Sequence, residues 1–446
     1  MDAREVALLT LTDCRRQGGW SDGVFSRKLA QAGLTGRDAA LATQICFGVL
    51  QNRTLLDFYL SEFSNIPLKR MERKVIEALR IGTYQMLFLT RIPHSAAVNS
   101  TVSMIKSYCK NPRAAGMVNA ILRSIERNLD NLPTIPNTDT VTYLSTLYSH
   151  PSWIVEQFIQ ILGEQEASHL LAVNNSQPPI TAMVNTTRIN MDGLLDELEK
   201  QGIGAEKHPW LDDCLVLSKT GGLEQIEAFS NGDFYIQDPA SRLAVMAANP
   251  QPGWKVMDCC AAPGGKSFST AILMKDKGEV LSCDIRSNKK KFITEGAARL
   301  QLHSIHAETA DGRIFCQKWE EQFDLVLVDA PCSGLGVIWK KPDIRYKDPS
   351  VLKNLPVIQA DILNNASHYV KPGGVLLYST CTVLQRENED VISAFLNKNQ
   401  NFHTDPFSLP GPIGDIHSGI LTLWPHKHGT DGFFMCRLRK ETETVG

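Results

Sequence analysis

Residues 254–270 read WKVMDCCAAPGGKSFST, and this stretch decides the fold class that we predict for the second half of the chain. Its apolar start is typical of a buried strand, and its end begins a helix. Between them, Gly264 and Gly265 let the backbone approach a ligand closely, and the new helix points its first amide groups at the same place. The spacings GxxxxGK[ST] and GxGxxG are both missing. We therefore expect a loop for a nucleoside, not for a triphosphate.

Strands and helices alternate regularly from about residue 233 onward. This alternation predicts a Rossmann-like α/β domain with a mostly parallel sheet and helices on both faces. The expected strands are WKVMDCC (254–260), EVLSCDI (279–285), FDLVLVDA (323–330) and GVLLYSTC (374–381). Ligands of open α/β sheets bind at the carboxyl ends of the strands, where the loop quoted above should lie.

The chain is predicted to be multidomain. Apolar residues recur at helical spacing within residues 1–130, as in ALATQICFGVL (40–50), which predicts an all-α domain. Residues 131–149 begin with two prolines among polar residues and are predicted to be a linker. Residues 150–232 mix helical and strand patterns and predict a small α+β module of the ferredoxin-like kind. The α/β domain is predicted to occupy 233–446.

Composition sets limits on the class of protein. Hydrophobic residues make up 43% and charged residues 21%, as in globular proteins with real cores. No apolar stretch approaches the ~20 residues that cross a bilayer, and the N-terminus, MDAREVALLT, is acidic where a signal peptide would be basic. The eleven cysteines show no paired CxxC spacing. We expect a cytoplasmic, monomeric protein with free thiols, no membrane contact and no metal.

Charge is distributed unevenly. Residues 1–130 carry 18 Lys and Arg against 11 Asp and Glu, whereas the remainder carries 28 against 37. A basic module joined to an acidic one suggests that the first meets a polyanion such as RNA. Judged from charge alone, the alternative that these basic residues only form an ordinary solvated surface has equal weight.

Three acids follow successive strand-like stretches: Asp284, Asp311 and Asp329. Asp284 stands twenty residues after Gly264, the position where a dinucleotide fold places an acid on ribose hydroxyls. Each acid alone is more often a helix cap or a turn residue. The ordered series suits a ligand with ribose hydroxyls, an exocyclic amine and a cationic centre. S-adenosylmethionine has all three features and is the predicted cofactor.

Two cysteines are expected to face the same crevice. Cys332 lies in the turn DAPC (329–332), and Cys381 ends the following strand in YSTCTVLQRENED (378–390). A thiolate that adds to carbon 6 of cytosine makes carbon 5 nucleophilic enough to accept a methyl group. An acid such as Asp329 could stabilise the charge that develops on the ring. The main alternative is that both cysteines are inert, buried residues, and a disulfide between them is a much weaker alternative. The spacing of the two cysteines does not decide which thiol attacks.

These motifs resemble a known family. DCCAAPGGK (258–266), DAPCSG (329–334) and YSTCT (378–382) followed by ENE (387–389) are similar to the RNA cytosine-carbon-5 methyltransferases of the Nol1/Nop2/Sun type. The helical first domain resembles the NusB antitermination fold. Bacterial members that join a NusB-like domain to the catalytic one methylate 16S ribosomal RNA. The resemblance covers essentially the whole chain, and it implies a class I methyltransferase domain with 16S ribosomal RNA as partner.

The resemblance also implies residue roles. Cys381 would be the nucleophile at carbon 6, Cys332 would assist product release, and Asp329 would contact the base edge and the methionine end of the cofactor. Asp284 would hold the ribose and Asp311 the adenine. The methionine part would be held by Cys260, Ala261, Ala262, Pro263, Gly264, Gly265 and Lys266. A small departure is Thr382, where Ser is commoner after the nucleophile.

The RNA backbone is expected to contact WKKPDIRYK (339–347), in which basic and aromatic residues interleave. The lysine triplet 289–291 is a second candidate, although a solvated helix face is the simpler reading. Three alternatives remain open: the same chemistry on transfer RNA or 23S ribosomal RNA, exchanged roles for the two cysteines, and a non-catalytic RNA-binding antitermination factor. A small-molecule methyltransferase would leave the basic helical domain unexplained.

Overall fold

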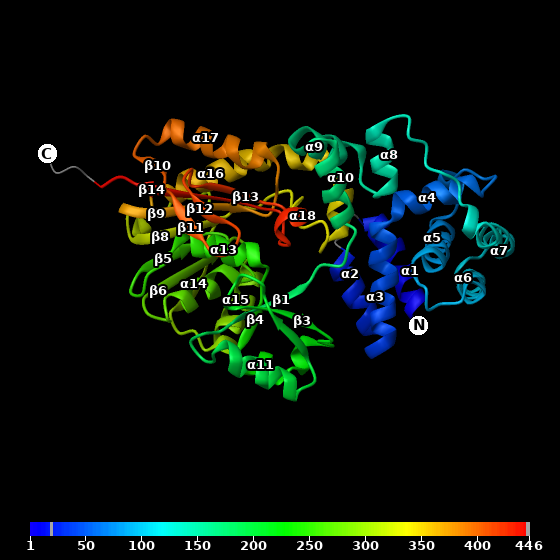
Figure 1. The fold of residues 1–446 in the computed structure, drawn as a ribbon, viewed down its shortest axis with the longest axis horizontal. Coiled ribbons are helices and arrows are strands. Elements are labelled where there is room, and N and C mark those ends of the chain that lie inside the picture. Colours follow the sequence, from blue (N-terminus) through cyan, green and yellow to red (C-terminus); the bar gives the residue numbers. More distant parts are fainter. Residues whose placement is uncertain (18–20, 443–446) are drawn as a thin grey trace. The chain divides into compact units, whose positions relative to one another are not determined.

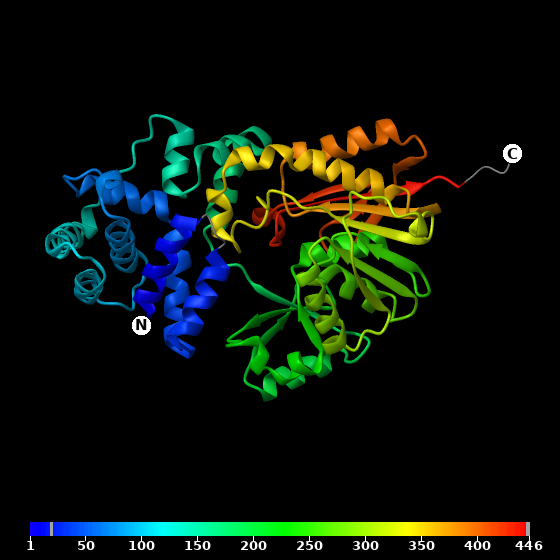
Figure 2. The same cartoon turned by 180° about the vertical axis from the view of Figure 1, so that it is seen from behind.

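A computed structural model describes residues 1–17 and 21–442, which form two compact units. The first unit comprises Met1–Ser176 together with the short segment Ile338–Lys347, and the second comprises Gln177–Val337 and the chain from Asp348 onward. The chain therefore leaves the second unit at residue 338 and returns to it at residue 348. Figures 1 and 2 show the two units from opposite sides.

The first unit is helical, as predicted. Its central helix, α5 (Arg73–Phe88), is buried along Val75–Met86. Arg80 of α5 is buried and pairs at 2.6 Å both with Glu77 of its own helix and with Asp57 of α4 (Arg53–Glu62), and the second pair joins the two helices. The other helices are α1 (Ala3–Gln17), α2 (Ser21–Ala32), α3 (Gly36–Gln51), α4 (Arg53–Glu62), α6 (His94–Tyr108), α7 (Pro112–Arg127), α8 (Thr140–Leu147), α9 (Ser152–Leu162) and α10 (Glu164–Val173). Helix α8 lies inside the range predicted as a linker, where Asp139 caps it by accepting from the Thr142 amide.

The second unit begins with a small antiparallel sheet in the order β2-β3-β1-β4. Its strands are β1 (Ile180–Val184), β2 (Gly204–Lys207), β3 (Cys214–Ser218) and β4 (Phe234–Ile236), accompanied by α11 (Met191–Lys200) and α12 (Glu227–Asn231). Four antiparallel strands with helices make a ferredoxin-like module, as predicted. Strand β4 lies beyond residue 232, the end predicted for this module from sequence.

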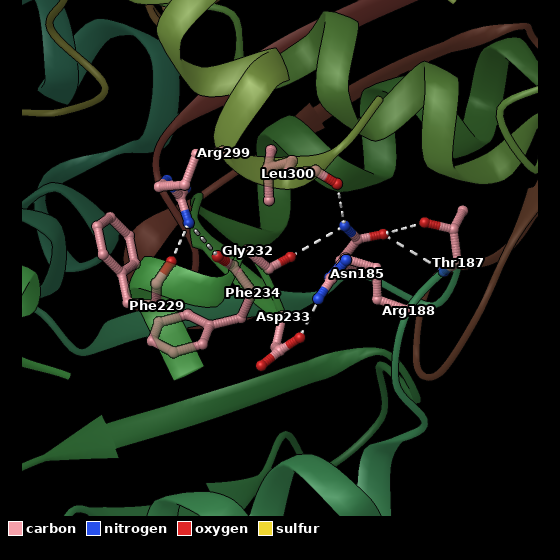
Figure 3. Close-up of polar contacts among 9 residues, drawn as sticks. All are labelled: Asn185, Thr187, Arg188, Phe229, Gly232, Asp233, Phe234, Arg299 and Leu300. Atoms are coloured by element: carbon pink, nitrogen blue, oxygen red, sulfur yellow. Dashed lines mark hydrogen bonds and ion pairs between the residues drawn. The ribbon is translucent and has the colours of Figure 1, made fainter. Parts of the chain in front are cut away.

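Buried hydrogen bonds join this module to the larger sheet domain (Figure 3). The Asn185 side-chain amide, which is fully buried, donates to the carbonyls of Gly232 at 3.0 Å and Leu300 at 2.9 Å. Arg299 donates to the carbonyls of Phe229 and Phe234. Gly232 has φ +83°, and a Cβ there would lie 2.0 Å from the Arg299 carbonyl oxygen. The module is thus anchored on the end of a helix of the large sheet domain, α15 (Ser287–Leu300).

The large sheet has the order β10-β14-β9-β8-β5-β6-β7, with β13 paired to β14. Strands β5 (Lys255–Asp258), β6 (Glu279–Asp284), β7 (Ile305–Thr309), β8 (Phe323–Asp329) and β9 (Val370–Thr380) run parallel. An edge of antiparallel strands follows: β10 (Phe402–Thr404), β13 (Ile420–Leu423) and β14 (Phe433–Lys440). A separate hairpin joins β11 (Phe407–Leu409) to β12 (Gly414–Ile416). The mostly parallel sheet confirms the predicted fold class.

Helices cover both faces of this sheet (Figure 1). Successive side chains of a strand point to opposite faces, so Val256 packs in one core and its neighbour Met257 in the other. The first core includes α13 (Pro239–Ala248), α14 (Gly265–Leu273) and α15; the second includes α16 (Leu355–Ser367) and α17 (Glu389–Lys398). A short α18 (Pro425–His428) precedes β14. No helix in the described ranges is both long and apolar enough to span a bilayer.

A candidate active site at the carboxyl edge of the sheet

Four acids gather at one edge of the large sheet. Asp329, Asp258 and Asp284 end the neighbouring parallel strands β8, β5 and β6, and Asp311 follows β7 by two residues. Cys381 comes directly after β9 at the same edge. The strand-end positions expected from sequence therefore lie side by side in the structure.

The two cysteines are in contact. The Sγ atoms of Cys332 and Cys381 lie 3.2 Å apart, a hydrogen-bond distance for thiols, and both cysteines are free. The Gly336 amide donates to the Cys381 carbonyl at 3.0 Å, and the Gly432 amide donates to the Gly336 carbonyl at 2.9 Å. A Cβ on Gly336 would lie 1.8 Å from the Gly432 oxygen. The absence of side chains at Gly336 and Gly432 lets their backbones pack directly against each other next to the thiol pair.

The electrostatic environment distinguishes the thiols. The hydrogen bond from Cys332 lowers the pKa of Cys381, and nearby Lys266 lowers it further, against burial and the charge of Asp329. The same hydrogen bond, together with burial and the charge of Glu387, raises the pKa of Cys332 well above its ordinary value. Cys381 is therefore the thiol that more readily becomes a thiolate, the form that acts as a nucleophile.

Asp329 is held in an ion pair beside the thiols. Its Oδ2 lies 2.7 Å from Lys266 Nζ, and its Oδ1 accepts from Ser379 Oγ at 3.0 Å. Lys266 is 7% exposed; it also donates to Ser241 Oγ at 2.8 Å and lies over the Phe433 ring. These contacts bring the glycine loop and the DAPCSG turn together.

The loop 260–266 runs into the N-terminus of α14 and requires glycine at position 264. Gly264 has φ +118°, and a Cβ there would lie 2.4 Å from Phe268. Gly265 is the first residue of α14, so amide groups at this end have no partner within the helix. Burial raises the pKa of the Cys260 thiol, which suits a structural cysteine and not a nucleophile. The bare backbone, the free helix end and the flanking acids fit the methionine and ribose of S-adenosylmethionine.

The predicted ribose and adenine acids have partners in the protein. Asp284 Oδ1 accepts from the Arg286 amide at 2.9 Å, and its Oδ2 lies 3.8 Å from Lys289 Nζ. Asp311 accepts from Arg313, with Nη2 at 2.6 Å and Nε at 3.0 Å. The Arg313 side chain lowers the pKa of Asp311. Contacts of these acids with the cofactor stay predictions.

One expected RNA-contact segment is turned inward instead. Within 339–347, Trp339 is 5% exposed and Arg345 is fully buried inside the helical unit. Arg345 donates to the carbonyls of Gln51 and Ser149, and Tyr346 donates to the Leu50 carbonyl at 2.7 Å. Trp339, Arg345 and Tyr346 thus anchor the segment in the first unit. Lys341 is exposed, so RNA contact by the lysines of this segment stays a prediction. In the other candidate, Lys290 and Lys291 are exposed.

Two buried acids were missed by the sequence reasoning. Asp258 ends β5 and accepts from Ser267 Oγ at 2.8 Å, and burial raises its pKa to about 6. Glu387 lies beside the turn that carries Cys332. Asp258 opens the quoted motif and Glu387 opens ENE, so both stood in recognised motifs without an assigned role. Within the described ranges, no three His, Cys, Asp or Glu side chains are arranged to hold a metal ion.

Parallel strands that end in a nucleoside-type loop beside paired thiols define a Rossmann-like methyltransferase. A family model described as 16S rRNA methyltransferase RsmB/F matches residues 245–439, the NusB family matches 1–127, and the ferredoxin-like domain of RsmF/B-like methyltransferases matches 150–224. The chain belongs to the RsmB/F family of ribosomal RNA methyltransferases.

Similar proteins extend over the full length. The probable ribosomal RNA small subunit methyltransferase B of Bacillus subtilis (strain 168) is 39% identical over 98% of both chains. A probable ribosomal RNA small subunit methyltransferase B of Synechocystis sp. is 31% identical over 99% of this chain and 100% of the relative. The crystal structure of PH0851 matches with a TM-score of 0.82 at 26% identity, covering 99% of each chain.

Proposed function

We propose that this protein transfers a methyl group from S-adenosylmethionine to carbon 5 of a cytosine in 16S ribosomal RNA, through a covalent bond between Cys381 and the base. The observation that carries the proposal is the thiol pair, 3.2 Å apart at the carboxyl edge of the sheet. Membership of the RsmB/F family and the names of full-length relatives support ribosomal RNA of the small subunit as the substrate.

The site supplies a nucleophile and a hydrogen-bond donor for this reaction. The Cys381 thiolate adds to carbon 6, and the electron pair of the C5=C6 bond moves into the ring. There Asp329, in its carboxylic-acid form, would donate a hydrogen bond to the developing negative charge. Carbon 5 is then nucleophilic. When bound, S-adenosylmethionine supplies an electrophilic methyl group. Loss of the carbon-5 proton restores the C5=C6 bond, and the S–C6 bond breaks to return the electron pair to Cys381.

The residues that would hold S-adenosylmethionine lie beside the thiols. The backbone of 260–266 and the first amides of α14 would bind the methionine part, and Lys266 would supply a positive charge for its carboxylate. Asp284 would accept hydrogen bonds from the ribose and Asp311 from the adenine amine. Contact of Asp311 with adenine would compete with its pair to Arg313.

The substrate base must leave its stack before both thiols can reach it, so the target is a loop nucleotide or a flipped one. The excess of basic residues in 1–130 supports RNA binding by the NusB-like domain. Transfer RNA and 23S ribosomal RNA are the competing substrates for the same chemistry. An antitermination factor without catalysis is the competing function, and the retained thiols argue against it.

Purified protein with labelled S-adenosylmethionine should be offered 16S ribosomal RNA, 23S ribosomal RNA and transfer RNA in parallel. We expect label in the 16S RNA alone, and nucleoside mass spectrometry should identify it as 5-methylcytosine. Label in a different RNA would identify that RNA as the substrate instead of 16S ribosomal RNA. Label on another atom of the base would overturn the thiol mechanism. Cys381→Ala should abolish labelling and serves as the matched blank.

A further inference from the structure

Glu387 clamps the turn that carries Cys332. It lies six residues after Cys381 and is fully buried. Its Oε2 accepts from the Ser333 amide at 2.8 Å and from Gln359 Nε2 at 3.0 Å. The Gln359 amide also donates to the Pro331 carbonyl at 3.0 Å. The carboxylate therefore holds Ser333 directly and Pro331 through Gln359, so the residues on both sides of Cys332 are fixed.

The clamp alone does not require a carboxylate. Both hydrogen bonds go to Oε2, and an amide oxygen in its place could accept both. The second oxygen, Oε1, is buried and makes no hydrogen bond within the described ranges. A buried charged group with an unpaired oxygen is destabilising. A side chain with one accepting oxygen would make the same clamp, and a carboxylate here also places a negative charge beside Cys332.

The charged groups around the thiols are placed unequally. Lys266 lies near Cys381, whereas Glu387 lies near Cys332. Asp329 faces both thiols, Asp431 faces Cys381, and Tyr378 donates to the Glu387 carbonyl at 2.7 Å. Two thiols in hydrogen-bond contact cannot readily lose both protons, because the thiolates would repel each other. Each thiol has two acids near it, and the cation Lys266 lies near Cys381, so the remaining proton stays on Cys332, where Glu387 supplies one of the two negative charges.

We propose that Glu387 is a positioning residue that keeps the thiol of Cys332 protonated and aimed at Cys381, so that Cys381 alone becomes the thiolate. This inference rests on the proposed function for its role in catalysis. On product release, the C5–H electron pair forms the C5=C6 bond, the carbon-5 proton passes to water, and the S–C6 pair returns to Cys381. The Cys332 thiol then donates its hydrogen bond to that returning thiolate.

The proposal is tested by the pH dependence of alkylation, which needs neither RNA nor S-adenosylmethionine. In Cys381→Ala protein, the rate of iodoacetamide labelling at Cys332 is followed from pH 6 to 10.5 by peptide mass spectrometry. Adding Glu387→Gln keeps an oxygen for the clamp and removes the charge. We expect labelling of Cys332 at pH 8 to become about tenfold faster, which corresponds to a shift of one pKa unit.

Two controls separate charge from folding. Glu389→Gln, two residues away on α17, should leave the Cys332 profile unchanged. Glu387→Asp keeps the charge and should stay near the profile of Cys381→Ala alone. The proposal is overturned if Glu387→Gln leaves the profile unchanged, or if Glu387→Asp accelerates labelling as much as Glu387→Gln does. Failure of methyl transfer to 16S RNA by the wild type would overturn the proposed function without altering these profiles.

Discussion

Replacing Arg345 by Met should unfold the helical unit much more easily. The guanidinium is buried, and no carboxylate is among its hydrogen-bond acceptors. Nη1 donates to the Gln51 carbonyl at 2.9 Å, the Ser149 carbonyl at 3.1 Å and Asn175 Oδ1 at 3.0 Å, and Nη2 donates to the Asn174 carbonyl at 3.3 Å. Methionine fills similar space but leaves these four acceptors without their donor.

The size of the effect follows from the acceptors. Each lost hydrogen bond to a buried acceptor costs about 1 kcal/mol or slightly more. Removing a buried charge offsets part of that loss, since burial lowers the pKa of Arg345 to about 10. We expect a net loss of about 2–4 kcal/mol in the free energy of unfolding, or about 5–12 °C in melting temperature for a unit of this size.

Urea unfolding followed by circular dichroism measures this loss, with Arg37→Met as the control because Arg37 is exposed on α3. The control should change the free energy of unfolding by less than about 0.5 kcal/mol. Arg345→Lys should also destabilise, because an ammonium cannot reproduce the planar fork. A loss below about 1 kcal/mol for Arg345→Met would refute the idea that this side chain anchors the 338–347 segment.

Three further predictions concern close packing and buried titratable groups. Gly336→Ala should reduce methyl transfer at least about tenfold, because its Cβ collides with the Gly432 oxygen and displaces the Cys381 carbonyl; unchanged activity would contradict the close crossing. Asp258→Asn should raise the melting temperature at pH 8. The folded-state pKa of Asp258 is raised to about 6, so its charge destabilises the fold above that pH, and the gain should shrink as the pH falls from 6 towards 4. His150 is buried, and burial lowers its pKa well below 6.5. Below about pH 6.5 the imidazole is therefore protonated in the unfolded chain only, and the free energy of unfolding should fall by up to about 1.4 kcal/mol per pH unit. Urea titrations at several pH values should show a smaller pH dependence for His150→Gln.

Much of the sheet could be predicted because its strands have a recognisable sequence pattern. The central residues of the buried parallel strands are mostly apolar, and β5, β6 and β8 each end in an acid. Strand β14, which lies between β9 and β10, was not predicted. Its sequence FFMCRLRK (433–440) carries two arginines and a lysine, and it pairs with β9 only after a long excursion of the chain.

Site residues could be predicted only where they stand at a position that the local sequence pattern marks, such as the end of a strand. The cysteines follow strand ends, so topology brings them together, but their 3.2 Å contact depends on the Gly336 and Gly432 crossing. Glu387 holds the turn from 54 residues away, a distance that no local pattern reveals. Arg345 looked like an RNA contact because composition reports which side chains are present and not which way they face.

Trapping of the RNA adduct tests the central claim, that Cys381 bonds to the base while Cys332 helps it leave. Wild-type, Cys332→Ala and Cys381→Ala proteins are incubated with 16S ribosomal RNA and S-adenosylmethionine, then separated on denaturing gels. Cys332→Ala should accumulate a covalent protein–RNA band that yields a cytosine-linked peptide containing Cys381, and Cys381→Ala should give none. An adduct that forms through Cys332 in the Cys381→Ala protein, or methyl transfer that survives the loss of both thiols, would contradict this account.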